Sequence, residues 1–101
     1  MKTMKVIFVR IYCTEGGGRL KELLSRLHDE FHVRGVTAFR GIAGFGASGK
    51  MHSTDLLDLS LDLPQVIEFF DEQDKVASIL AELSGSFKAG HVVSWPAEVN
   101  I

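Results

Sequence analysis

The chain has 101 residues and a formal net charge of −2, with 46% hydrophobic and 24% charged residues. This length suits one globular domain over residues 1–101, and the slight acidic excess excludes the basic surface that a nucleic-acid partner needs. The apolar runs are far shorter than the roughly 20 residues of a membrane helix, and a single cysteine, Cys13, cannot form an internal disulfide, so we expect a protein of the reducing cytoplasm.

The first half of the chain predicts a strand, a helix and a second strand. Residues 5–13 (KVIFVRIYC) are rich in β-branched and aromatic side chains, which is typical of a strand. Apolar side chains recur at helical spacing from Leu20 to Phe31, and Gly35 follows a basic last turn, so a helix should end there. Residues 36–43 (VTAFRGIA) predict the second strand.

The second half predicts a strand, a helix and a strand again. Residues 57–63 (LDLSLDL) alternate strictly, which predicts a strand with a bulge or bend at Pro64. Asp71 is expected to be the N-cap of the second helix. Residues 91–99 (HVVSWPAEV) form the last strand, at an edge of the sheet because Pro96 cannot donate a ladder hydrogen bond. The buried stripe of the second helix consists of Val76, Ile79, Leu80 and Leu83.

This βαββαβ order predicts an α+β, ferredoxin-like sandwich, in which an antiparallel four-stranded sheet carries two helices on one face. The other face of such a sheet is normally polar. In the first strand, however, Ile7, Val9 and Ile11 point to one face while Val6 and Phe8 point to the other. The chain supplies no third layer, so we expect other subunits to cover the second face.

Residues 44–51 (GFGASGKM) fit both G-x-G-x-x-G and most of G-x-x-x-x-G-K-[ST]. Both motifs need a helix directly after the glycines, and the second also needs a hydroxyl where Met51 stands. The alternating pattern that follows is that of a strand, so both matches are coincidental. The glycine amides and Lys50 could still contact an anion from a hairpin loop.

These residues also resemble a known family. Three short stretches resemble the end of the second strand and the start of the T-loop in PII signalling proteins: residues 36–38, 44–46 and 49–50. Residues 84–90 (SGSFKAG) resemble the PII B-loop, in which glycines and a lysine hold nucleotide phosphates. A PII-like family of unknown function is similar over nearly the whole chain. The resemblance to that family rests on Arg10-Ile11-Tyr12 with Glu15, on Arg40-Gly41-Ile42 with Gly44-Phe45-Gly46, and on Leu59 to Pro64 followed by Asp71-Glu72.

The resemblance implies a homotrimer, not an enzyme, that binds AMP, ADP or ATP in clefts between subunits and signals through a loop over residues 44–58. Its regulated target would be a membrane transporter or an enzyme. The T-loop glutamine and tyrosine of PII proteins have no counterpart here, which argues against 2-oxoglutarate sensing and uridylylation. The implied nucleotide contacts are Arg40, Gly41, Gly44, Phe45, Gly46, Lys50, Gly85, Lys88 and Gly90.

Two arginines within strands have alternative interpretations. Arg10 is expected to form an ion pair with a neighbouring strand or subunit. Arg40 fits an ion pair and a phosphate contact equally well.

A metal site is the alternative function. His28 and His32 lie four residues apart on the first predicted helix, a spacing that can bind zinc. This pair would suit a small trimeric protein that binds divalent metal, similar to the cation-tolerance family. Cys13 ends a strand on its apolar face, which favours a buried, inert thiol.

An enzyme is a third interpretation. Acylphosphatases share the βαββαβ order and hold phosphate in a loop after the first strand, where this chain has Gly16-Gly17-Gly18-Arg19. Their catalysis needs an asparagine on a middle strand, whereas the only asparagine here is Asn100.

Overall fold

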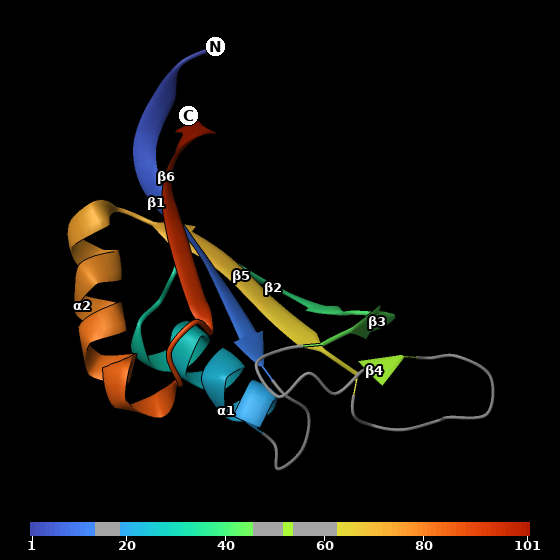
Figure 1. The fold of residues 1–101 in the computed structure, drawn as a ribbon. Helices are drawn as coiled ribbons and strands as arrows, with labels where there is room; N and C mark the ends of the chain where they lie inside the picture. Colours follow the sequence, from blue (N-terminus) through green and yellow to red (C-terminus); the bar gives the residue numbers. More distant parts are fainter. Residues whose placement is uncertain (14–18, 46–51, 54–62) are drawn as a thin grey trace.

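The computed structural model describes residues 1–13, 19–45, 52–53 and 63–101. Figure 1 shows two helices packed on the same side of a sheet, with the two chain termini next to each other. None of the helices in these ranges is long and apolar enough to cross a bilayer. In chain order the elements are β1 (Thr3–Cys13), α1 (Arg19–Ser25), η1 (Arg26–Glu30), β2 (Gly35–Arg40), β3 (Ala43–Gly44), β4 (His52–Ser53), β5 (Gln65–Asp71), α2 (Gln73–Leu83), η2 (Ser84–Ser86) and β6 (Val92–Asn100).

The main sheet has four strands in the order β2-β5-β1-β6, and all of its pairings are antiparallel. The two-stranded pair β3-β4 lies outside it. This is the predicted ferredoxin-like arrangement of one antiparallel sheet and two helices. Pro96 lies on β6, which is an edge strand as expected from its missing N–H.

The core lies between the sheet and the two helices. Val9 and Ile11 of β1 are fully buried, and Phe69 of β5 is the largest fully buried side chain. Alternation along each strand sends these residues to the helix-covered face and their neighbours to the other face. The remaining buried members of this core are Cys13, Leu23, Leu27, Ile67, Val76, Ile79 and Leu83.

The first helix changes geometry in its second half. The segment η1 is a π-helical turn, in which the Phe31 N–H donates to the Arg26 carbonyl at 2.9 Å. His32 follows with a φ of 50°, the only non-glycine residue of the described chain in the left-handed region. The Val33 N–H then donates to the Leu27 carbonyl at 3.1 Å. This bond connects the segment before β2 to the end of the first helix.

One predicted strand is divided in the structure, and another lies mostly outside the described residues. The strand expected over residues 36–43 is divided, because β2 ends at Arg40 and Ala43 belongs to β3. The strand expected over 57–63 falls outside the described residues except for Leu63, which is buried but not in a strand. Directly after Pro64, the residue at which a bend was expected, the chain enters the sheet strand β5.

Asp71 is not the N-cap that we predicted. It is the last residue of β5 and is buried, and Glu72 is the N-cap of α2. The Asp71 carboxylate accepts hydrogen bonds from the backbone N–H groups of Glu72 at 2.8 Å and Arg34 at 3.2 Å, and from Lys75 Nζ at 3.0 Å. The alternation of β5 carries this side chain into the interior, where it joins three segments of the chain.

The face of the sheet turned away from the helices, which we call the open face, is covered by neither helix (Figure 1) and carries a cluster of aromatic side chains. Phe8 stacks against Trp95 with ring centroids 4.8 Å apart and against Phe70 at 6.3 Å. Arg10 lies 5.4 Å from the Trp95 ring and forms an ion pair with Glu68. The structure thus confirms the predicted apolar second face and the predicted ion pair of Arg10.

Candidate functional site

The segment Ser84–Gly90, which we call the glycine loop, connects α2 to β6. It starts with the short 3-10 turn η2 and ends at Gly90, whose φ of 85° favours glycine. Lys88, Ala89 and Gly90 are all exposed. A hollow of about 280 Å³ lies against the loop, lined by Leu80, Leu83, Ser84, Phe87, Lys88, Ala89, Gly90 and Val92.

The two ends of the glycine loop are anchored by neighbouring elements. At the start, the Ser84 hydroxyl donates to the Ala81 carbonyl at 3.0 Å. At the end, the His91 carbonyl accepts from the Tyr12 N–H at 2.8 Å, and His91 Nδ1 lies 3.2 Å from the Tyr12 carbonyl oxygen. Between them, exposed glycines and the Lys88 ammonium present the donors that an anion needs.

The second group of predicted residues lies at the end of β2. Arg40 is the last residue of this strand and is exposed, and Phe45 is 70% exposed just after β3. The Gly41 N–H donates to the Pro64 carbonyl at 2.7 Å. Gly44 also lies against Pro64, whose Cγ would be 3.3 Å from a Cβ added there. Of the remaining predicted contacts, Gly46 and Lys50 fall outside the described residues.

Gly41 has a steric reason to be glycine. A Cβ at this position would lie 2.8 Å from Pro64 Cγ and 3.3 Å from the Pro64 carbonyl oxygen. The proline ring and backbone would have to shift, so Gly41→Ala should lower the free energy of unfolding by about 1–2 kcal/mol. Urea denaturation measures this change. Gly35→Ala is the matched control, since a Cβ there would meet no atom within 4 Å, and it should not destabilise the protein; equal losses for both variants would contradict the steric account.

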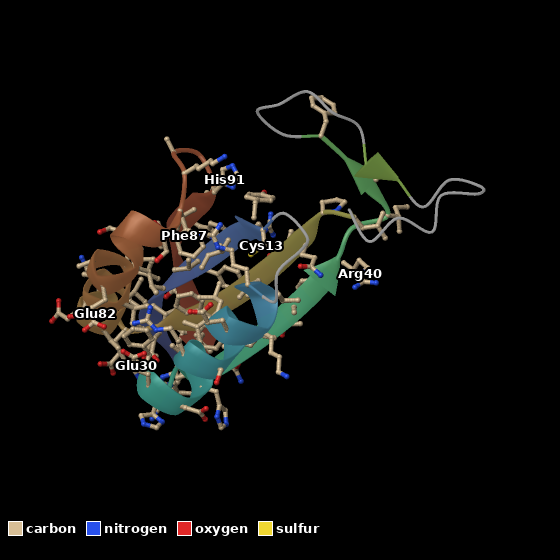
Figure 2. The ribbon with its side chains drawn as sticks, turned by 90° about the horizontal axis from the view of Figure 1, so that it is seen from below. Cys13, Glu30, Arg40, Glu82, Phe87 and His91 are labelled. Atoms are coloured by element: carbon tan, nitrogen blue, oxygen red, sulfur yellow. The ribbon has the colours of Figure 1, made fainter. Side chains whose placement is uncertain are left out.

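The two groups lie at the same end of the sheet but on opposite edges. Arg40 is opposite Gln65, which in turn is opposite Cys13, while His91 contacts Tyr12. Three strand spacings separate β2 from β6, or about 14 Å. Figure 2 shows Arg40 well separated from Phe87 and His91. Among the predicted contacts that the structure describes, one chain therefore does not bring the two groups together into one pocket.

Within the described part of the chain, the candidate metal site gains no third ligand. His28 Nδ1 lies 2.6 Å from Asp29 Oδ1, and both side chains are exposed. The hydrogen bond from His28 is the main cause of the lowered pKa of Asp29, with a further bond from Ser25. In the ranges that the structure describes, no three His, Cys, Asp or Glu side chains form a group that could hold a metal ion.

The structure also bears on the cysteine and on the arginine of the acylphosphatase-like loop. Cys13 is buried, and burial raises the pKa of its thiol, as expected of an inert cysteine. Of the acylphosphatase-like loop, Gly16, Gly17 and Gly18 fall outside the described residues. Arg19 contacts the glycine loop instead: it donates to the Ser86 carbonyl and its guanidinium lies 5.7 Å from the Phe87 ring. No motif in the sequence indicated this contact between residues 67 positions apart.

Comparison with known proteins identifies the family. The family model of DUF190, described as "Uncharacterized ACR", matches residues 4–99. This chain belongs to the DUF190 family. Among its relatives is a UPF0166 protein of Aquifex aeolicus, which is 35% identical over 85 residues that cover 84% of this chain and 86% of the relative.

Solved structures confirm the PII-like fold of this DUF190 protein. CPII of Thiomonas intermedia K12, a nitrogen regulatory PII-like protein bound to ADP, AMP and bicarbonate, superposes with a TM-score of 0.68. The two are 22% identical, and the match covers 99% of this chain and 91% of CPII. A "putative PII-like signaling protein" of Thermus thermophilus gives a TM-score of 0.63 at 16% identity, over 98% of this chain and 91% of that protein. The resemblance to PII-like proteins that the sequence suggested is therefore confirmed at the level of family and fold.

Proposed function

We propose that residues 1–101 form one PII-like regulatory domain that binds an adenine nucleotide and is not an enzyme. The glycine loop is the observation that carries this proposal. It presents an exposed lysine and exposed glycines at one end of a fold whose neighbour CPII holds ADP and AMP. AMP, ADP and ATP are the candidate ligands, and the cytoplasm is the proposed location.

The nucleotide site is proposed to lie between subunits of a homotrimer. The glycine loop and the Arg40 region lie at the same end of the sheet on opposite edges, so a rotated neighbour can bring one beside the other. Lys88 would approach the phosphates from one subunit, and Arg40 or Lys50 from the next. The proposed contacts are Arg40, Gly41, Gly44, Phe45, Gly46, Lys50, Gly85, Lys88 and Gly90.

The open face supports self-association. Exposed fractions of 41% for Tyr12, 50% for Phe39 and 44% for Val93 are large for apolar side chains around an aromatic stack, and a monomer would leave this surface in water. Size exclusion with light scattering should give about three chain masses. A stable monomer at micromolar concentration would refute the trimer.

Signalling is proposed to pass through the loop over residues 44–58 to a membrane transporter or an enzyme. Within this range, the structure describes only residues 44–45 and 52–53. The proposal therefore follows from the fold and from the position of β3 and β4 outside the main sheet.

Calorimetry with AMP, ADP and ATP tests nucleotide binding directly. We expect saturable binding of at least one of them to the purified protein, with up to one site per subunit. Absence of heat for all three at millimolar nucleotide, confirmed by equilibrium dialysis, would overturn the proposed function.

Lys88→Ala tests the position of the site. A hydrogen bond to a charged group is worth about 1.5–3 kcal/mol, so this change should weaken nucleotide binding by about tenfold to a hundredfold. The melting temperature without ligand should stay nearly constant, because Lys88 is exposed and outside the core. Lys21→Ala, an exposed lysine on α1, is the matched control. If both variants bind like the wild type, the site does not involve the glycine loop.

A further inference from the structure

We infer that Arg19 is a positioning residue that holds the middle of the glycine loop in its binding conformation. The inference rests on the proposed nucleotide site, and it names a residue outside the proposed contacts. Its basis is the pair of contacts from α1 to the loop: the hydrogen bond of Arg19 to the Ser86 carbonyl and the guanidinium over the Phe87 ring.

These contacts lie between the two anchored ends of the loop. Ser84 is bonded within the end of α2, and His91 is bonded to β1. Phe87 is half-buried and packs against the core, and the guanidinium of Arg19 lies over its ring. The hydrogen bond to Ser86 therefore connects the loop backbone to α1 at a point that neither end anchor reaches.

Few close side-chain contacts other than those of Arg19 connect α1 to the glycine loop. A hollow of about 120 Å³ lies between α1 and the loop, lined by Arg19, Glu22, Leu23, Arg26, Leu83, Ser86 and Phe87. The guanidinium therefore bridges a space that apolar side chains leave unfilled. Arginine suits this role because its planar group can stack on an aromatic ring and donate a hydrogen bond at the same time.

The bond to Ser86 also affects its neighbours. Fixing the Ser86 carbonyl and the Phe87 ring limits the conformations open to Lys88, Ala89 and Gly90, which follow directly. A loop held in its bound conformation loses less conformational entropy when ligand binds. Arg19 would thus strengthen nucleotide binding through the loop without touching the phosphates.

Two measurements on Arg19→Ala test this inference. In the free protein, hydrogen exchange of the loop amides, including that of His91, which donates to the Lys88 carbonyl at 3.2 Å, should become about fivefold to tenfold faster. The nucleotide dissociation constant should rise by a similar factor. Arg19→Lys, which keeps the charge and one donor but not the planar stack, should recover part of both effects, and Lys21→Ala should change neither.

The outcomes separate the inference from the proposed function. Unchanged loop exchange in Arg19→Ala would overturn the positioning role, even if binding weakened, because a direct phosphate contact would explain that. Faster exchange with unchanged nucleotide affinity would also overturn it. If the wild type binds none of AMP, ADP and ATP, the proposed function fails, while the exchange comparison still decides whether Arg19 holds the loop.

Discussion

Replacing Asp71 with alanine should lower the free energy of unfolding by about 2–4 kcal/mol. The carboxylate is 4% exposed and accepts bonds from Glu72, Arg34 and Lys75. Alanine would remove the acceptor and leave two backbone N–H groups without their partner in a part-buried position. Urea denaturation at fixed protein concentration measures the loss. Asp74→Ala, which removes an exposed carboxylate in the first turn of α2, is the control and should cost less than about 1 kcal/mol.

The same carboxylate predicts a pH dependence. Burial by itself would raise the pKa of Asp71, but the bonds from Glu72, Lys75 and Arg34 outweigh burial and lower it. A lowered folded-state pKa means that this stabilisation is present at neutral pH and is lost as pH falls below about 4. The difference in unfolding free energy between wild type and Asp71→Asn should shrink over that range. A difference that stays constant down to about pH 2 would show that the charge of Asp71 contributes nothing.

Trp95→Asp should convert the proposed trimer into monomers. Trp95 lies on the edge strand β6 and stacks on Phe8 at 4.8 Å on the open face, so an aspartate there would both remove the aromatic surface and bury a charge at each interface. Burying an unpaired carboxylate costs several kcal/mol, and we expect association to weaken at least a hundredfold. Light scattering at micromolar concentration should then report one chain mass in place of three.

Ser94→Asp is the control for this change. Ser94 is the preceding residue on β6 and is exposed. It lies opposite Val9 and therefore points to the other face. Its variant should keep the wild-type mass. A trimer that survives Trp95→Asp would show that the open face is covered by something other than a second copy of this chain.

Hydrophobic periodicity was sufficient to predict the order and type of the main elements. The long helical stripe after Leu20, the β-branched run of β1 and the apolar second face were all legible in the sequence, because each depends on local spacing. The exact start of β5 was not legible. The strict alternation over residues 57–63 gave a stronger strand pattern than QVIEFFD, which pairs with both β1 and β2. Of residues 57–63 the structure describes only Leu63.

The site was harder to predict because its geometry depends on contacts between residues that are far apart in the sequence. Glycines and a lysine identify a loop that can approach an anion, and the glycine loop has that form. The bonds that hold the loop come from Arg19 and Tyr12, 67 and 79 residues away from their partners. Side-chain contacts over such separations leave no periodic trace in one sequence. Asp71 was misassigned as a cap because its burial depends on the register of β5, which the sequence did not specify.

The strand order has a consequence for synthesis on the ribosome. Each pairing in the four-stranded sheet, β1 with β5, β1 with β6 and β2 with β5, joins a strand of the first 40 residues to one that begins at Gln65 or later. The nascent N-terminal half can therefore form none of this sheet by itself. Non-local pairing of this kind slows folding and leaves apolar strands uncovered meanwhile. The sheet can be completed only when Asn100 pairs with Thr3, after the segment that includes β6 has left the ribosomal tunnel.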